Sequence, residues 1–342
     1  MGANRNEATE ETKLSQKCQQ GLDGLNCEYV LDIEGADNLY LPKEVKKNDF
    51  ESTIVEIGCT GGKLTAYVNP VHCIRPNNIK PLGIVDAIRL ELIYSEVVEF
   101  IQEYLKKYLG DKHSEEYIQK LKVTRLECNL TLPCQAGARP TDIINLFDRV
   151  YDKTVLHRRF RKKYEKVNES FYYVRPKMYA IKVYSKESEQ KAIGNFNVED
   201  NLLRIEVVFL QRSIVRMYGE EKRTLGDVLT KQAVVTLCQE YKRVFEDEII
   251  SRGIKPFLNK CVEKLLESLR DPENKQPVAE TIAKCREYIP DIEVLRRALK
   301  RWYREKEIED GSRQTIRHYR NRNFNIPEGV IQTIKAFRNA TE

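Results

Sequence analysis

The chain has 342 residues, enough for two domains or for one large domain with an appendage. It carries 58 Lys and Arg against 52 Asp and Glu, so nucleic-acid binding would have to come from local clusters of cations. Its nine cysteines lack the close spacing of a zinc knuckle, and no apolar run is long enough to span a membrane. Zinc-ribbon and membrane-spanning classes are therefore excluded, and we expect reduced thiols in a cytoplasmic protein.

The N-terminal part of the chain shows one clear hairpin and one clear helix. Residues 1–50 are polar and irregular, and we expect a floppy leader there with at most a short strand at Cys27–Ile33. Residues 51–69 predict a β-hairpin, because two apolar-alternating runs flank a Cys-Thr-Gly-Gly turn. After a proline-containing loop at 70–81, apolar residues recur every three or four positions and predict a helix over Gly83–Leu109.

Three later segments alternate between apolar and polar residues, as strands with one buried face do. They are Val123–Leu132, Met178–Lys186 and Asn201–Leu210. The polar residues on the second face are Arg125, Glu127, Asn129, Lys182, Tyr184, Lys186, Arg204 and Glu206. If the strands share one sheet, that face holds two carboxylates, a tyrosine and several cations. This is the inventory for metal-assisted phosphoryl transfer with a tyrosine nucleophile.

Helical patterns separate and follow these strands. A helix is expected at Arg139–Tyr151, opened by Pro-Thr-Asp, and a further strand is expected at 170–175. Residues 211–270 predict helices throughout, and Asp271–Pro277 has the composition of a linker before a last charged, helical stretch.

The order of elements predicts an α+β fold. We expect a central, antiparallel-rich sheet with flanking helices over 51–220, and a mostly helical C-terminal region over 221–342 that binds DNA. With the polar leader at 1–50, this gives three regions along the chain.

Glu127 and Glu206 are a candidate site for a divalent metal ion. Mg²⁺ takes oxygen ligands, often one or two carboxylates together with water and substrate phosphate. Asn129, two residues along the strand from Glu127, could supply another oxygen. The residues leave a second interpretation open, in which both carboxylates are solvated and paired with Arg125 and Arg204.

Tyr184 is a candidate nucleophile. A phenol with a pKa near 10 attacks poorly at neutral pH, but a metal ion or the neighbouring Lys182 and Lys186 would stabilise its phenolate. The chain has 18 tyrosines, and a strand tyrosine usually just packs, so from the spacing alone packing is the stronger interpretation of Tyr184. The rival tyrosines in the same region are Tyr172, Tyr173 and Tyr179.

Two basic segments are candidates for DNA contact. His157–Lys166 interleaves cations with two aromatic residues, which suits single-stranded nucleic acid, although a solvated surface has the same composition. Its cations include Arg158, Arg159, Arg161, Lys162 and Lys163. Arg296–Arg322 is also basic but contains acidic residues, and two helices around Gly311 and Ser312 would form a helix-turn-helix.

Taken in order, these motifs resemble the replication initiator nickase of filamentous phages, and more distantly the rolling-circle plasmid initiators that use a tyrosine nucleophile. That group has an Arg-hydrophobic-Asp strand, a helix, a strand with the catalytic tyrosine beside a lysine, and a hydrophobic-Arg-hydrophobic-Glu strand. The matching pieces are Thr124–Glu127, the helix from Pro140, Ile181–Lys186 and Leu203–Glu206. The aspartate of the first strand is Glu127 here, whose longer side chain would shift the metal.

The resemblance implies an enzyme that nicks origin DNA. Tyr184 would form a 5′-phosphotyrosyl intermediate and release a 3′-hydroxyl, and the strand would be rejoined later. Mg²⁺ or Mn²⁺ would bind Glu127, Glu206 and Asn129, while Lys182 and Lys186 would orient the phosphate. Arg125, Arg204 and the cations of His157–Lys166 would contact the DNA.

The same resemblance implies single-stranded or origin DNA as the partner, with a host helicase and polymerase, in the cytoplasm of a bacterial host. Two other functions remain open from the residues. One is a non-catalytic DNA-binding regulator, and the other is a metal-dependent nuclease that activates water and never becomes attached to DNA.

Overall fold

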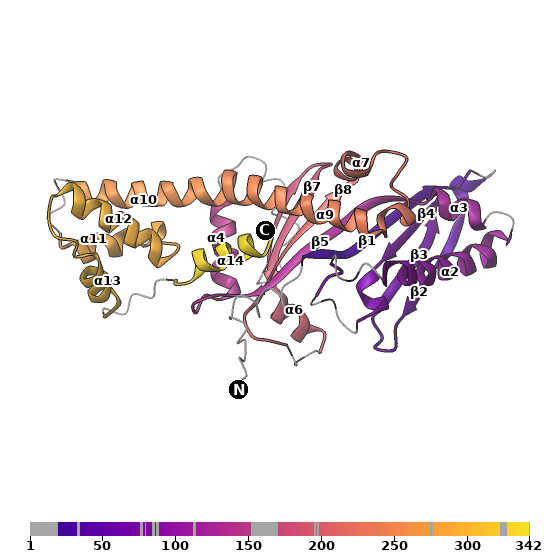
Figure 1. Ribbon diagram of the computed structural model, residues 1–342, viewed down its shortest axis with the longest axis horizontal. Coiled ribbons are helices and arrows are strands. Elements are labelled where there is room, and N and C mark those ends of the chain that lie inside the picture. Colours follow the sequence, from indigo (N-terminus) through magenta and orange to yellow (C-terminus); the bar gives the residue numbers. More distant parts are fainter. Residues whose placement is uncertain are drawn as a thin grey trace, which may run out of the picture.

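The computed structural model is an elongated molecule with a β-sheet in one half and a small helical lobe at the opposite end (Figure 1). A long helical rod joins the two (Figure 1). The structure describes residues 20–341, except for 33–34, 76–77, 79, 84–85, 87–88, 112–113, 152–169, 195, 197, 272, 274–275 and 322–326.

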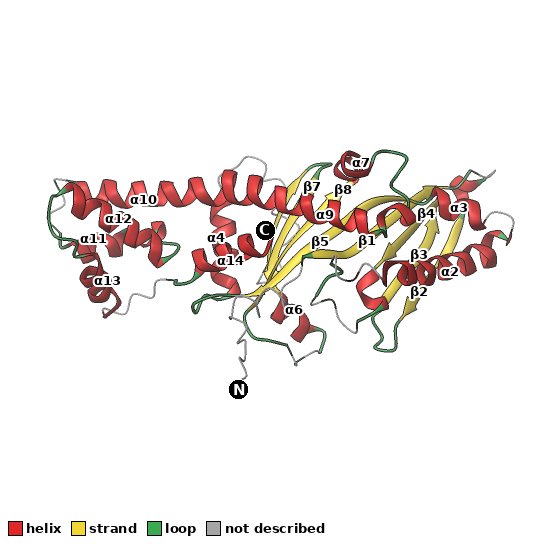
Figure 2. Ribbon diagram, in the orientation of Figure 1, coloured by secondary structure: helices red, strands yellow, loops and turns green. Residues whose placement is uncertain are grey.

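An eight-stranded sheet forms the core, and each pair of neighbouring strands is antiparallel (Figure 2). Its spatial order is β2-β3-β4-β1-β5-β8-β7-β6. The strands are β1 (Gly21–Val30), β2 (Tyr40–Lys47), β3 (Thr53–Thr60), β4 (Lys63–Val68), β5 (Lys122–Pro133), β6 (Ser170–Arg175), β7 (Tyr179–Ser185) and β8 (Leu202–Leu210). The predicted α+β class is confirmed, and the three motif-bearing strands are neighbours in the order β5-β8-β7.

The expected leader over 1–50 is wrong from Gly21 onward. β1 lies at the centre of the sheet between β4 and β5, and β2 forms one edge. The hairpin predicted at 51–69 is confirmed as β3 and β4. Its turn uses Gly61 and Gly62, which both have positive φ angles that suit glycine.

Helices cover one face of the sheet. Its apolar residues, such as Leu126 in β5, Ile205 in β8 and Ile181 in β7, are at most 1% exposed. The helices in contact with the strands here are α2 (Leu90–Leu109), α4 (Pro140–Tyr151), α7 (Gln211–Tyr218) and α9 (Lys231–Val244). α2 confirms the predicted helix from Leu90, with Ile93, Val97 and Ile101 buried at helical spacing.

The opposite face of the sheet is polar, and it is more enclosed than the sequence pattern suggests. The short helix α6 (Lys186–Ala192) and the segment around Asn78 lie over it. Every residue of β8 except the last is buried. The carboxylates on this face are therefore not solvated, and leaving one of them without a partner costs more free energy than it would in water.

The rod is formed by α9, a π-helical segment at Phe245–Ile254 and α10 (Lys255–Arg270), which follow one another without a break (Figure 1). The remaining elements are two 3₁₀ turns (Ala36–Asn38 and Pro70–Cys73), α3 (Ser114–Lys120), α8 (Leu225–Val228), α11 (Val278–Lys284), a 3₁₀ turn (Arg286–Tyr288), α12 (Ile292–Glu305), α13 (Ser312–Asn321) and α14 (Val330–Thr341). α11, α12 and α13 form the lobe at the far end of α10 (Figure 1).

The boundary expected at residue 220 does not separate two cores. α9 packs on the sheet, where Tyr241 Oη donates a 3.0 Å hydrogen bond to the carbonyl of Ile205. α14 returns to the end of β5, where the amide of Gln135 donates to Thr333 Oγ1 at 2.9 Å. Within the described residues, no helix has both the length and the apolar character needed to cross a bilayer.

Candidate active site on the polar face of the sheet

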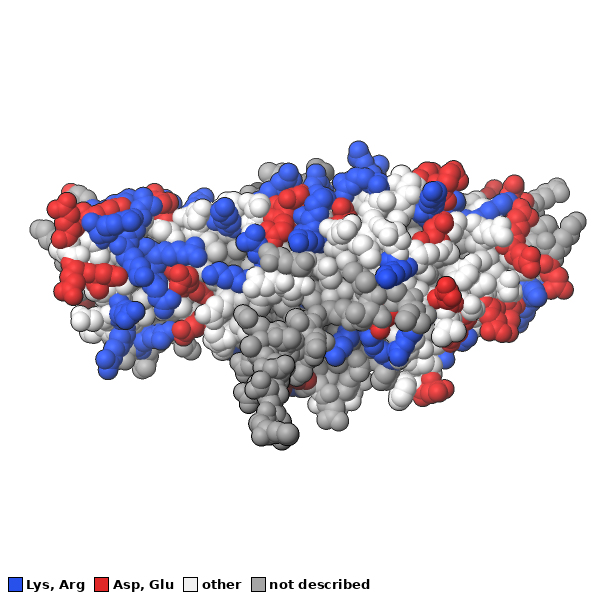
Figure 3. Space-filling view, in the orientation of Figure 1, with Lys and Arg blue, Asp and Glu red and all other residues white. Residues whose placement is uncertain are grey.

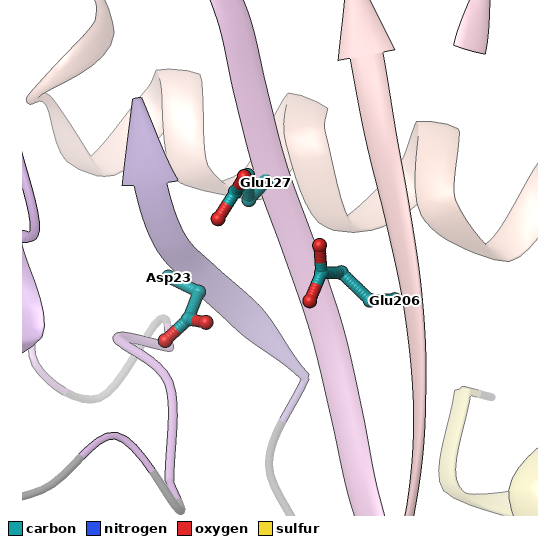
Figure 4. A group of neighbouring side chains, drawn as sticks. All are labelled: Asp23, Glu127 and Glu206. Carbon is teal, nitrogen blue, oxygen red and sulfur yellow. The ribbon is translucent and has the colours of Figure 1, made fainter. Parts of the chain in front are cut away.

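Three neighbouring strands bring three carboxylates together on the polar face. Asp23 comes from β1, Glu127 from β5 and Glu206 from β8 (Figure 4). One oxygen of each lies within 4.8 Å of the others, and the three residues are only 3%, 8% and 3% exposed. A cluster of three buried carboxylate oxygens at this spacing can hold a divalent metal ion.

Asp23 is the member of the group that sequence reasoning missed. It lies at a shift in register between Leu22 and Gly24 in the pairing of β1 with β5. Because of this extra residue, Leu22 and Leu25 are both buried although they are three positions apart. The regular alternation that would mark a strand is broken there, and the two glycines of GLDG lower the strand propensity further.

Two glycines of β1 make room for the site. A side chain at Gly24 would place its Cβ 2.9 Å from Glu127 Oε2 and 3.1 Å from the hydroxyl of Tyr67. At Gly21 the Cβ would collide with the carbonyl of Leu82, which pairs with Leu22 through backbone hydrogen bonds of 2.8 Å. The close approach of the β1 backbone to Glu127 therefore requires glycine at Gly24, and the close pairing with Leu82 requires glycine at Gly21.

Several buried oxygen atoms at this site have no hydrogen-bond partner among the described residues. They include Asp23 Oδ1 and the side-chain oxygen of Asn129. Asn129 is fully buried and pairs in register with Glu206, on the strand face that also carries Glu127. Since an unpaired buried oxygen is costly, the donor set fits an oxygen-binding cation.

Three cations also surround the carboxylates. Lys182 Nζ lies 2.5 Å from Glu206 and 3.9 Å from Glu127, and Arg125 forms an ion pair with Glu127. Arg204 lies 3.1 Å from Asp23. The cluster is thus balanced in charge within the protein, and a bound metal ion would have to compete with these pairs.

The pKa values of the three carboxyl groups are pushed in different directions. Burial raises the pKa of Asp23, and burial together with the charge of Glu206 raises that of Glu127. Burial acts in the same direction on Glu206, but the charge and hydrogen bond of Lys182 outweigh it and lower the pKa of Glu206. Glu206 is therefore the carboxylate that stays ionised most readily.

Tyr184 lies directly beside this group. Its hydroxyl donates a 3.1 Å hydrogen bond to Glu206 Oε2, and burial raises the pKa of the phenol well above its usual value. Tyr172 pairs in register with Lys182 and also lines the cavity, as does Tyr67 of β4. Tyr173 and Tyr179 pair with residues of the apolar face, which removes both from the site.

The two basic residues expected to meet substrate here are occupied inside the protein. Arg204, expected to contact DNA, is 0% exposed and donates to Thr131, Asp23 and the carbonyl of Asn78. That expectation is wrong because the face is covered. Lys186 begins α6 rather than ending β7, and it is also 0% exposed, bonded to Asn78 at 2.8 Å and to Glu189. Burial lowers the pKa of Lys186 to about 8.

The other predicted DNA contacts fall into two groups. Arg125 is partly exposed, with 36% of its side chain accessible at the rim of the site. Arg158, Arg159, Arg161, Lys162 and Lys163 lie outside the residues that the structure describes.

A cavity of about 790 Å³ opens over the carboxylates. It is lined on one side by Tyr67 and Glu56, and on the other by Tyr172 and the residues of α6. The space exceeds what a single metal ion needs and is large enough for a nucleotide-sized ligand. No family model and no curated protein matches this sequence.

Proposed function

We propose that this protein is a DNA-nicking and strand-joining enzyme that initiates rolling-circle replication, with Tyr184 as its nucleophile. The observation that carries the proposal is the 3.1 Å hydrogen bond from the Tyr184 hydroxyl to Glu206, inside a cavity that also holds Asp23 and Glu127. A phenol, a proton acceptor and a set of oxygen ligands are thus within reach of one phosphodiester.

Asp23, Glu127 and Glu206 would hold Mg²⁺ or Mn²⁺, with Asn129 as a further oxygen donor. Such an ion polarises a phosphate and lowers the pKa of a neighbouring phenol. This help is needed because burial keeps Tyr184 protonated at neutral pH.

In the proposed step, Tyr184 Oη attacks the scissile phosphorus and its proton passes to Glu206. The bond between Oη and phosphorus forms as the bond to the 3′ oxygen breaks, and that oxygen takes a proton from solvent. The products are a 5′-phosphotyrosyl enzyme and a free 3′-hydroxyl. Lys182, which bridges Glu206 and Glu127, holds the acceptor carboxylate in place. The phosphotyrosyl bond conserves the energy needed to reseal the strand.

The test uses single-stranded DNA from the element's own replicon, labelled at its 3′ end so that the label stays on the fragment joined to Tyr184, incubated with Mn²⁺ and run on a denaturing protein gel. A labelled band at the mass of the protein is expected, and it should disappear in Tyr184→Phe and Glu206→Gln. Tyr172→Phe is the matched control, because Tyr172 lines the same cavity but is not the proposed nucleophile. Cleavage without a labelled protein would instead support a nuclease that uses water.

One observation favours a second candidate, a DNA-binding regulator without catalysis. Each carboxylate already has a cationic partner, so the polar face could be held together by ion pairs alone. In that case the protein retains DNA in a salt-sensitive manner, cleaves nothing with any divalent ion, and gains no thermal stability when Mn²⁺ is added.

A further inference from the structure

The helix α13 has an unusual composition for a surface helix. Its sequence, SRQTIRHYRN, contains three arginines and a histidine and no acidic residue. Ile316 and Tyr319 are buried against the rest of the lobe. Arg313, Gln314, Arg317 and His318 are exposed on the outer side. The inner face of this short helix thus packs against the lobe. The outer face presents guanidinium, amide and imidazole groups to solvent.

The lobe holds α13 in a fixed position. Tyr303 of α12 shares a 2.8 Å hydrogen bond with Thr315 in α13, and the carboxylate of Asp310 accepts from the amide of Ser312 at the helix start. Trp302 donates to the carbonyl of Leu269 at 3.0 Å and ties α12 to the end of the rod. Because these contacts hold the inner side of α13, the side chains on its outer side keep fixed positions relative to one another.

The cations on this surface differ from those on the neighbouring rod. On α10, Arg270 pairs with Glu305 and Lys264 with Glu267. No ion pair within the described residues engages Lys300, Arg313 or Arg317. Lys and Arg gather over this end of the molecule in Figure 3, with acidic side chains beside them. α12 contributes the exposed Arg304 and also Arg297, which pairs with Glu293.

Acidic residues are present close by, but they do not lie on α13. Glu307 and Glu309 are exposed in the turn that joins α12 to α13, and Asp310 is used at the start of the helix. A polyanion that approaches the turn is repelled, whereas one that approaches Arg313, Gln314 and Arg317 on the outer face of α13 meets cations and a neutral amide. At the other end of the helix, Arg320 pairs with Glu328. The charge pattern therefore directs a linear polyanion along α13.

We propose that α12 and α13 form a duplex-DNA-binding unit in which α13 enters the major groove. Arginine can pair with the O6 and N7 atoms of guanine and glutamine with adenine, so Arg313, Gln314 and Arg317 have the chemistry for reading base edges. They lie in the first two turns of the second helix of a helix-turn-helix, which is the part that contacts bases in that motif. Arg297, Lys300 and Arg304 contact the phosphates. The proposal rests on the proposed function for the choice of DNA as the polyanion, and it adds a surface separate from the nicking site.

Binding is measured in EDTA by fluorescence anisotropy, so that nicking cannot contribute. The probes are a mixed-sequence duplex of about 30 base pairs, roughly three turns of B-DNA, and one of its single strands. The full chain with Arg313→Ala and Arg317→Ala should bind the duplex at least about tenfold more weakly. Lys43→Ala with Lys106→Ala is the matched control, because both lysines are exposed on the sheet half and their loss removes the same charge.

A second variant separates charge from recognition. Arg313→Lys with Arg317→Lys should keep most of the non-specific affinity but lose the sequence preference found by selection from a random duplex library. Equal loss of affinity in the control pair and in the alanine pair would overturn the proposal, as would unchanged duplex binding in the alanine pair. Because cleavage of single-stranded DNA is assayed separately, failure of this surface and failure of Tyr184 as nucleophile give different results.

Discussion

The polar face of the sheet and the outer face of α13 both carry arginines, but in opposite surroundings. Arg204 is fully buried and bonded to Thr131, Asp23 and the carbonyl of Asn78. Arg317 is exposed and has no ion pair within the described residues. The hydrogen bonds of Arg204 are thus used within the protein, whereas the guanidinium of Arg317 is accessible to a partner. Burial and existing bonds, rather than the residue type, decide which cation can meet DNA.

The contrast between Arg204 and Arg317 predicts a large difference in the free energy of unfolding of their alanine variants. Arg204→Ala should lower the free energy of unfolding by about 3–5 kcal/mol, because it leaves Asp23 buried without its partner. Arg317→Ala should change it by no more than about 0.5 kcal/mol. Urea denaturation of both variants checks this. Similar values for the two would mean that the polar face is more solvated than its packing indicates.

Asp23 tests the chemistry of the polar face, because it is the proposed metal ligand that could be found only from the fold. Asp23→Asn should slow nicking by roughly 10²–10³-fold, while leaving duplex binding through α13 unchanged. Glu56→Gln is the control, because Glu56 lines the same cavity but is not part of the triad. The rate of label transfer to the protein is measured with saturating Mn²⁺. Equal slowing in both variants would contradict a specific role for Asp23 in the reaction.

The pH dependence of metal binding follows from the raised pKa values of Asp23 and Glu127. A metal ion must displace any proton on these carboxylates, so Mn²⁺ affinity should rise with pH across and above the ordinary carboxyl range until both are ionised. Calorimetric titration measures this, and Glu127→Gln should bind more weakly with a flatter pH profile. An affinity that does not change over this interval would contradict the assignment of these groups as ligands.

Lys186 gives an effect that is confined to alkaline pH. Its folded pKa of about 8 lies below the ordinary lysine value of 10.5, so between these values the unfolded chain binds more protons than the folded protein. Its contribution should therefore raise the stability as pH increases across this interval, by up to about 3 kcal/mol. Wild type and Lys186→Met are compared by urea denaturation at several pH values. A constant difference between them would show that Lys186 keeps its proton throughout.

The sequence predicted the sheet well where alternation was regular. β5, β7 and β8 each alternate through their central residues, and the structure makes them neighbours in the sheet with Glu127, Glu206, Lys182 and Tyr184 on one face. Strand parity is a local property, so no knowledge of the tertiary fold was needed for this step.

What the sequence could not supply came from long-range packing. The register shift at Asp23 interrupts the alternation of apolar residues, so the sequence does not indicate a strand at β1. The pairing of β1 with β5 is what places Asp23 beside the other two carboxylates. In the same way, strand parity placed Arg204 on the polar face but could not show that Asn78 and α6 cover it. Both errors arise because tertiary contacts override a local pattern.

The most direct test of the account is to identify the amino acid that carries the DNA. The adduct formed with Mn²⁺ is digested with nuclease and protease, and the peptide that retains a nucleotide is sequenced by mass spectrometry. We expect the nucleotide on Tyr184, at the junction of β7 and α6. A nucleotide on Tyr67 or Tyr172, or cleaved DNA without any modified peptide, would contradict the central claim.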